Sequence, residues 1–146
     1  IEPELAFADV FDTMECAEAY VQYCIKFIFK ITNKLAFIEK DKKGHIDYLK
    51  SLVDGPFAKA SYIKQFKSFK TYRLYYLVIK KGVVFPEDKN KIEWGIDLAS
   101  EHERYLCEHI FHRPVILYNY PKHIKAFYMR DNEDGKTVAA FDILAP

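Results

Sequence analysis

Two runs of apolar residues near the end of the chain have the length and composition of β-strands. They are Pro114–Tyr120 (PVILYNY) and Thr137–Leu144 (TVAAFDIL). A third run, Ile124–Arg130 (IKAFYMR), lies between them, and Gly135 marks a sharp turn after it. Strands joined by a short turn pair side by side in antiparallel order. We therefore predict three strands, of which the last two form a hairpin.

A helix is expected directly before these strands, at Ser100–His112. It begins with the S-x-x-E capping pattern of Ser100 and Glu103, and Leu106 and Ile110 supply its apolar face. A helix followed by strands and a hairpin predicts an α+β fold, in which helices back an antiparallel or mixed sheet.

The first third of the chain is predicted to hold one strand and two helices. Glu2–Val10 (EPELAFADV) alternates like a strand, and Asp12 followed by Glu15 predicts the start of a helix. That helix carries apolar residues at helical spacing: Met14, Ala17, Val21, Cys24, Ile25 and Ile28. A short helix is expected at residues 46–53, and Gly55-Pro56 ends it.

The segment Tyr62–Gly82 carries basic and aromatic side chains and no acid. Its pattern fits either one long helix or a strand at Tyr75–Ile79. Lysines interleaved with aromatic rings are found where proteins hold single-stranded nucleic acid. Solvated lysines around a partly buried aromatic stripe are the commoner arrangement, so both interpretations stay open.

Composition sets the broad class of the protein. Of 146 residues, 50% are hydrophobic and 29% are charged, as in globular and not disordered chains. The formal net charge of +1 excludes a chain dominated by polyanion binding. No apolar run approaches the ~20 residues of a membrane-spanning helix. The chain starts at Ile1 without Met, so we expect it to be a piece of a larger protein.

Spacing alone gives few candidates for a functional site. Glu2 and Glu4 share one face of the predicted strand, and two like charges there need a cation or water nearby. A solvated face is the ordinary interpretation, and a wall that binds an ammonium group or a metal is the sharper one. No phosphate-binding loop, nucleophile motif or zinc-protease motif occurs, so no reaction class follows from motifs.

Histidines and cysteines also receive ordinary interpretations. The three histidines of the predicted helix, which have no partner set at zinc-ligand spacing, are His102, His109 and His112. Three cysteines fit no disulfide framework and indicate reduced thiols. Cys16 and Cys24 are expected to be buried thiols, and Cys107 has no C-x-x-C partner.

Two longer stretches are much more specific. They are EPELAFADVFDTMECAEAYVQY at Glu2–Tyr23 and EWGIDLASEHERYL at Glu93–Leu106, which continues as RPVILYNYPKHIKAFYMRDNEDGKTVAAFDILAP at Arg113–Pro146. They cover about half of the chain and closely resemble asparaginyl-tRNA synthetases, class II enzymes of the aspartate/asparagine/lysine subgroup. The runs P-K-x-I-K-A-F-Y-M and D-G-K-T-V-A-A favour the asparagine enzyme.

This resemblance implies an antiparallel catalytic sheet flanked by helices, which activates asparagine with ATP and Mg²⁺ to an adenylate. The asparaginyl group then passes to the terminal ribose of the tRNA, and catalysis is mainly positioning and charge stabilisation. The resemblance also implies a homodimer as the full-length protein, no membrane association, and a cytoplasmic location, with organellar forms known in the family.

The resemblance implies roles for four residues. Glu2 matches the acid that holds the substrate α-ammonium group, and Tyr128 matches a tyrosine that reaches the amino-acid pocket. Glu4 and Asp142 lie in matching strands and are expected to support the site. Three residues of another matching stretch are predicted to serve in helix caps and salt bridges: Glu101, Glu103 and Arg104.

The other motifs of this family fall outside the 146 residues. They are the arginine that binds the α-phosphate, the glycine-rich third motif, the acidic metal-binding stretch and the anticodon-binding barrel. We therefore expect residues 1–146 to be part of a catalytic domain, without catalytic or metal-ligating residues and inactive alone. Residues 63–82 depart from the family pattern and form an atypical segment.

Two other functions fit the sequence. One is a non-catalytic, synthetase-derived module that binds RNA or protein through the basic segment Lys64–Lys81. The other is a paralogue that makes asparagine itself, with ammonia in place of tRNA as the acceptor.

Overall fold

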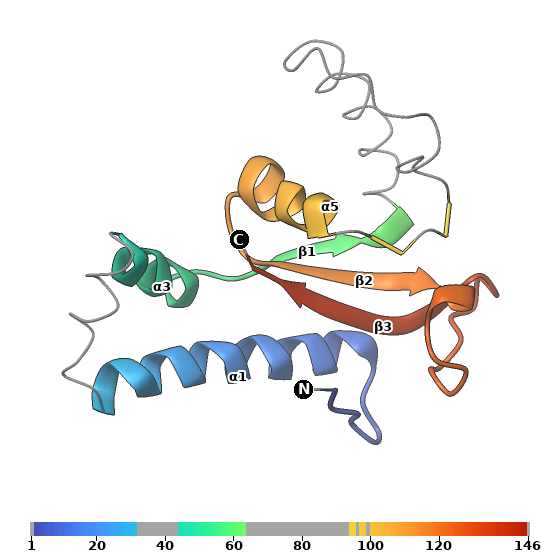
Figure 1. Ribbon diagram of the computed structural model, residues 1–146. Helices are drawn as coiled ribbons and strands as arrows, with labels where there is room; N and C mark the ends of the chain where they lie inside the picture. Colours follow the sequence, from blue (N-terminus) through green and yellow to red (C-terminus); the bar gives the residue numbers. More distant parts are fainter. Residues whose placement is uncertain (1, 32–43, 64–93, 96, 99, 146) are drawn as a thin grey trace, which may run out of the picture. The chain divides into compact units, whose positions relative to one another are not determined.

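The computed structural model describes residues 2–31, 44–63, 94–95, 97–98 and 100–145 (Figure 1). Two compact units make up the chain, Ile1–Ala58 and Lys59–Pro146, and each has its own architecture. Most of the segment Tyr62–Gly82, including nearly all of the atypical residues 63–82, lies outside the described residues. The elements in chain order are α1 (Val10–Ile31), α3 (His45–Val53), β1 (Ala58–Ser61), α5 (Ser100–Tyr105), η1 (Leu106–Phe111), β2 (Val115–Pro121), η2 (Lys122–Ile124) and β3 (Thr137–Leu144).

Helix α1 begins one turn earlier than the sequence predicts. The Asp9 Oδ1 atom accepts hydrogen bonds from the backbone N–H groups of Phe11, at 2.7 Å, and Asp12, at 2.9 Å. In return, Asp12 Oδ2 accepts the Asp9 N–H at 3.0 Å. This reciprocal pair is a capping box with Asp9 as the N-cap. The prediction that Asp12 caps the helix, with Glu15 as its partner, is therefore wrong.

The predicted strand at residues 2–10 is also wrong. The residues before α1 form an irregular segment with a turn at Ala6 and Phe7. Phe7 has a φ of 60°, in the left-handed region, which interrupts the alternation that a strand requires. Glu2 and Glu4 are therefore exposed side chains of an irregular segment and do not share a sheet face.

The first unit is held together by contacts between α1 and the segment after α3. Glu18 Oε1 accepts the Phe57 N–H at 2.9 Å, and Gln22 Nε2 donates to the Gly55 carbonyl at 3.1 Å. Phe57 is buried beside these bonds. Helix α3 ends at Val53, so the predicted short helix and its end before Gly55 are confirmed.

The second unit is built on a three-stranded sheet in the order β1-β2-β3. Strands β2 and β3 are antiparallel, from the pair Val115 and Leu144 to the pair Tyr118 and Phe141. Figure 1 shows β1 pointing the same way as β2, so the sheet is mixed. The register shifts at Asn119, which has a φ of 59°. The strands predicted before Pro121 and at residues 137–144 are confirmed, as is the α+β class.

The third predicted strand, at residues 124–130, is wrong. Lys122–Ile124 is a 3-10 turn (η2), and the Met129 N–H bonds to the Ala126 carbonyl in a further turn. Strand β3 pairs with β2 instead, because β2 is the apolar, buried strand of this unit. Phe127, in the middle of the run 124–130, is by contrast 98% exposed. The turn at Gly135 is confirmed by its φ of 63°.

The helix predicted at residues 100–112 is present but changes its winding. Helix α5 continues directly into the wider π-helix η1, and His112, the residue that caps its end, has a left-handed conformation. Leu106 and Cys107 are fully buried, whereas Ile110 is 38% exposed. The buried face is therefore carried by Leu106 and Cys107, and the predicted role of Ile110 is wrong.

Among the helices that the structure describes, none combines the length and the apolar character needed to cross a membrane.

Candidate functional site

The residues that the sequence singles out as a substrate site lie in different units. Glu2 and Glu4 are exposed in the first unit. Tyr128 is in the second unit, 55% exposed, and its ring packs edge-on against Phe127 with the centroids 5.7 Å apart. Asp142 is on β3 of the second unit and is half-buried. Of the four, Asp142 is the residue embedded in a charged cluster.

Asp142 is held by a lysine that the sequence analysis did not single out. Lys125 Nζ lies 2.8 Å from Asp142 Oδ2 and 4.0 Å from the centroid of the Tyr120 ring. The Tyr120 hydroxyl is also hydrogen-bonded to Asp142. Burial, and then the Asp142 charge, raise the pKa of Tyr120, so this phenol stays protonated and donates to the carboxylate. One lysine and one tyrosine therefore fix the carboxylate of Asp142.

Glu103 brings a second carboxyl group to the same cluster. Burial raises the pKa of Glu103, the charges of Asp142 and Asp97 raise it further, and Lys125 opposes them. Neither Glu103 nor Arg104 forms an ion pair within the described residues, so the salt bridges predicted for them are not found there. The Glu101 side chain lies outside the described ones. Lys125 is thus the cation that balances these carboxyl groups.

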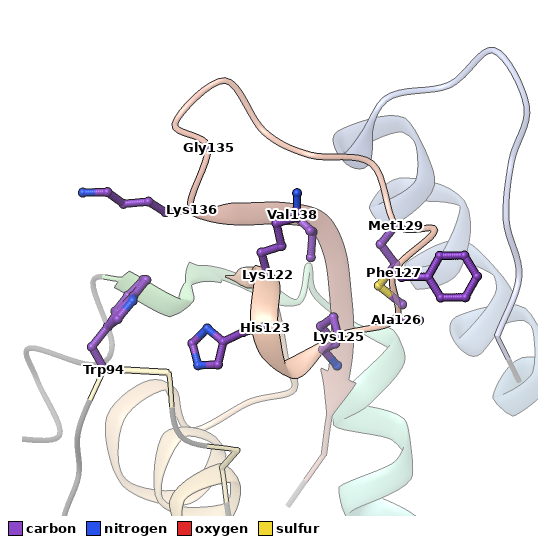
Figure 2. A pocket seen from close by; sticks show the side chains of 10 residues that line it. All are labelled: Trp94, Lys122, His123, Lys125, Ala126, Phe127, Met129, Gly135, Lys136 and Val138. Carbon is purple, nitrogen blue, oxygen red and sulfur yellow. The ribbon is translucent and has the colours of Figure 1, made fainter.

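A cavity of about 570 Å³ opens beside this cluster (Figure 2). Its walls combine apolar side chains with basic ones, and none of the described residues that line it is acidic. Phe127 points away from the other side chains in Figure 2 and forms only the rim. The lining residues are Trp94, Lys122, His123, Lys125, Ala126, Phe127, Met129, Gly135, Lys136 and Val138.

One wall of the cavity is a turn whose peptide is held from two sides. His123 Nε2 lies 3.0 Å from the Gly95 carbonyl oxygen and donates to it. The Gly95 backbone N–H in turn donates to the Tyr62 hydroxyl. Burial raises the pKa of Tyr62, and this hydrogen bond opposes the rise only in part. The Tyr62 ring packs against the rings of both Trp94 and Tyr120, with the ring centroids 5.5 Å apart in each pair. Gly95 has a φ of 88°, and a Cβ there would overlap the His123 ring.

The thiols and histidines supply no additional site among the described residues. Cys107 is buried, and burial raises its pKa to about 11, so the thiol stays protonated near neutral pH. Cys16 is exposed and Cys24 is half-buried, so the prediction that both are buried is wrong. No group of three or more His, Cys, Asp or Glu residues in the described part could hold a metal ion.

Sequence reasoning missed Lys125, Tyr120, His123 and Gly95. The signal was present in Tyr120-Pro-Lys-His-Ile-Lys125, where basic residues follow a buried strand at the end of the sheet. Reading residues 124–130 as a strand concealed it, because a strand would alternate these side chains between two faces.

Comparisons with known proteins agree with this architecture. Residues 1–146 match the family of class II tRNA synthetases (D, K and N). The chain is 49% identical, over all of its length and 24% of the relative's, to the cytoplasmic asparagine–tRNA ligase 1 of Arabidopsis thaliana. Its structure is similar to that of asparaginyl-tRNA synthetase from Pyrococcus horikoshii, with a TM-score of 0.71 and 32% identity.

The likeness covers 97% of the chain and 29% of that synthetase. The same synthetase in complex with asparaginyl-adenylate gives a TM-score of 0.70 at 32% identity. The chain therefore spans about a quarter of the length of the relatives it matches. Because the family match extends over the whole sequence, the chain belongs to the class II tRNA synthetases of the D, K and N group.

Proposed function

We propose that the protein containing this chain activates asparagine with ATP and transfers it to its tRNA. The observation that carries the proposal is the match over the entire chain to asparagine–tRNA ligases, at 49% identity for the Arabidopsis relative. The fold likeness to a synthetase that was solved with asparaginyl-adenylate supports the same reaction. A cytoplasmic location is part of the proposal, because one relative is named as a cytoplasmic form. A homodimer of the full-length protein is also part of it, and rests on the family resemblance alone.

Within this proposal, Glu2 accepts hydrogen bonds from the α-ammonium group of asparagine and neutralises its charge. Tyr128 offers a hydroxyl to a polar group of the substrate, and its 55% exposure leaves it accessible. Glu4 and Asp142 support the site. For Asp142 the support has a physical basis, because Lys125 and Tyr120 hold its carboxylate in one orientation.

ATP supplies the adenylyl group, and Mg²⁺ would neutralise its phosphates. The described residues do not fit a magnesium site by themselves. Asp142 is paired with Lys125, and no third acidic or histidine ligand joins it and Glu103 in a metal-binding group of the described part. We therefore assign no metal ligand to this chain.

The test is asparagine-dependent exchange of pyrophosphate into ATP by the longer protein that contains these residues. Exchange with asparagine, and not with aspartate or lysine, is expected. Transfer to tRNA separates a tRNA ligase from a paralogue that uses ammonia and forms free asparagine. Exchange that needs no asparagine, or that prefers aspartate, would refute the proposal. Salt-sensitive RNA binding without exchange would favour the non-catalytic module.

Variants then test the site residues. Glu2→Gln and Tyr128→Phe are each expected to raise the KM for asparagine by roughly tenfold, the loss of one good polar contact. Glu133→Gln, an exposed residue of the turn before β3, is the matched control and should leave KM unchanged. An unchanged KM in both site variants would remove these two residues from the substrate site.

A further inference from the structure

The exposed turn that carries Tyr128 begins at a lysine whose side chain is fixed. Lys125 Nζ lies 2.8 Å from Asp142 Oδ2 and 4.0 Å from the centroid of the Tyr120 ring. We propose that Lys125, held by these two residues, is a positioning residue that places the Tyr128 hydroxyl for the amino-acid substrate. The inference deepens the proposed function and rests on it, because Tyr128 meets a substrate only in that proposal.

Burial contributes little to the position of this turn. Phe127 is 98% exposed and Tyr128 is 55% exposed, so neither ring gains much from the hydrophobic effect. The Met129 N–H bonds to the Ala126 carbonyl at 3.2 Å, which closes the turn on itself and does not attach it to the sheet. A segment with little buried apolar surface opens easily unless its ends are fixed. The position of the Tyr128 side chain therefore depends on the two ends of the turn.

Strand β3 fixes both ends. At the end of the turn, the Arg130 carbonyl accepts the Ala139 N–H of β3 at 2.8 Å. At its start, the Lys125 ammonium group binds Asp142, which lies further along the same strand. Because β3 is paired with β2, the two attachment points keep a constant separation. The attachment at Arg130 is made by backbone atoms, whereas the one at Lys125 is made by side chains and can be removed by substitution.

The surroundings of Lys125 make this attachment stronger than a surface ion pair. The Lys125 side chain is 21% exposed, and a charge so far out of water needs a partner. Asp142 supplies the opposite charge, and the face of the Tyr120 ring attracts the ammonium group as well. The Tyr120 hydroxyl also bonds to Asp142, which restrains the carboxylate. By contrast, Lys50 and Asp47 on α3 form an exposed pair at 3.8 Å, which is expected to contribute little.

Exchange kinetics of the longer protein that contains this chain test the role of Lys125. Lys125→Met should raise the KM for asparagine roughly tenfold and leave kcat unchanged, as expected for the loss of one polar contact to the substrate. Lys125→Arg keeps the charge and can lie on the Tyr120 ring, so it should restore most of the loss. Lys50→Met, which breaks the exposed pair on α3, is the matched control and should leave KM unchanged. An unchanged KM in Lys125→Met, or no recovery with arginine, would overturn the proposal.

A double substitution shows whether Lys125 acts through Tyr128. If Lys125 only places the Tyr128 hydroxyl, removing the lysine costs nothing further once that hydroxyl is absent. Lys125→Met combined with Tyr128→Phe should therefore have the same KM for asparagine as Tyr128→Phe alone, roughly tenfold above the native value. A KM that rises roughly a hundredfold in the double variant would show two independent effects and would overturn the positioning role.

The position of the turn also has a readout that needs no activity. Chymotrypsin cleaves after aromatic residues, so cleavage of the same folded protein after Phe127 and Tyr128, located by mass spectrometry, reports how often the turn opens. Lys125→Met and Asp142→Asn should each be cleaved there roughly tenfold faster than the native protein and Lys50→Met, because a charge-assisted bond is lost. Equal cleavage of all four proteins would overturn the attachment at Lys125.

The two assays separate this inference from the proposed function. Faster cleavage without asparagine-dependent exchange in the native protein would refute the proposed function and leave the attachment at Lys125 standing. Asparagine-dependent exchange with an unchanged KM in Lys125→Met would refute the positioning role alone.

Discussion

The turn at Trp94 and Gly95 depends on a residue without a side chain. Gly95 combines a φ of 88° with a position at which an added Cβ atom would overlap the His123 ring. Gly95→Ala should lower the free energy of unfolding by about 2 kcal/mol or more, because left-handed strain and overlap with the ring both act. Thermal unfolding followed by Trp94 fluorescence measures the loss.

Gly135→Ala is the control for strain without overlap. Gly135 has a φ of 63° and open space where a Cβ would stand, so the loss should be about 1 kcal/mol. If the two alanine variants lose equal stability, the overlap between the new Cβ at position 95 and the His123 ring does not destabilise the fold.

The three cysteines should differ in reactivity because their surroundings differ. Cys107 is fully buried, and its pKa of about 11 leaves roughly one molecule in a thousand as thiolate at pH 8. Cys16 is exposed and Cys24 half-buried. Alkylation with iodoacetamide, located by peptide mass spectrometry, should modify Cys16 first, Cys24 next and Cys107 only after unfolding. Native-state modification of Cys107 as fast as that of Cys16 would contradict the burial of this thiol.

Individual residue roles were partly predictable from the sequence. Asp142 could be singled out through the family resemblance of its strand, but its partners Lys125 and Tyr120 could not. Lys125 lies beside Asp142 because the chain turns directly after β2, and Asp142 is on β3, the strand that pairs with β2. The sequence pattern does not say which strands pair. Burial of Cys16 was predicted from helical spacing, which does not say which side of a helix a neighbour covers.

At the scale of an element, the start of α1 shows how a cap is chosen. Asp9 and Asp12 both fit an N-cap pattern, but Asp9 Oδ1 accepts two backbone N–H groups of the first turn. Asp9→Ala should therefore cost about 1 kcal/mol of stability. Asp12→Ala removes only the reciprocal bond to the Asp9 N–H and should cost less. Thermal unfolding followed by far-ultraviolet circular dichroism checks the order, and a larger loss in Asp12→Ala would restore Asp12 as the cap.

The turn before β3 carries a pH dependence through Asp134. Its carboxylate accepts the N–H groups of Lys136 and Thr137 and the Thr137 hydroxyl, each at 2.8 Å, and these bonds lower the pKa of Asp134. A carboxyl group with a lowered folded-state pKa stabilises the fold in full above its unfolded pKa, about 3.9. That contribution is lost as the pH falls through the lower, folded-state value.

Melting temperatures of the native chain and of Asp134→Asn isolate this effect. The difference between the two should be constant above about pH 5 and should shrink as the pH falls below about 4, because the other acids titrate equally in both proteins. If the difference stays constant down to the lowest pH at which the fold persists, protonation of Asp134 does not change the stability of the fold.

The elements themselves illustrate what local pattern can and cannot predict. Strands β2 and β3 were predictable because both are long apolar runs closed by turn residues. The run Ile124–Arg130 has a similar composition, yet it forms turns. A strand exists only where a partner continues its backbone hydrogen bonds. This run meets β3 only at its end, where the Ala139 N–H bonds to the Arg130 carbonyl beside an isolated bridge between Asp131 and Val138.

At the scale of the whole molecule, the family could be predicted from long stretches of specific sequence, even where individual helices and strands were predicted wrongly. The geometry of the substrate site could not be predicted in this way. Glu2 and Tyr128 belong to different compact units, and spacing in the sequence does not say whether two such residues lie close together.

The two units should also unfold separately. Among the described residues, the buried side chains of the first unit are few, Met14, Leu52 and Phe57, whereas the second unit buries most of β2 and residues of η1 and β3. A small unit with little buried apolar area has little stability of its own. The 22-residue helix α1 gives the first unit a strong signal in circular dichroism, and Trp94 reports on the second.

Thermal unfolding of the chain should therefore give two midpoints, with helical ellipticity lost before the Trp94 emission shifts. Asp9→Ala should lower the first midpoint and leave the second unchanged, and Gly95→Ala should do the reverse, because each substitution weakens one unit only. Coincident midpoints that move together in both variants would show instead that the units form one cooperative structure, in which the charged cluster around Asp142 and the helix α1 share a single free energy of unfolding.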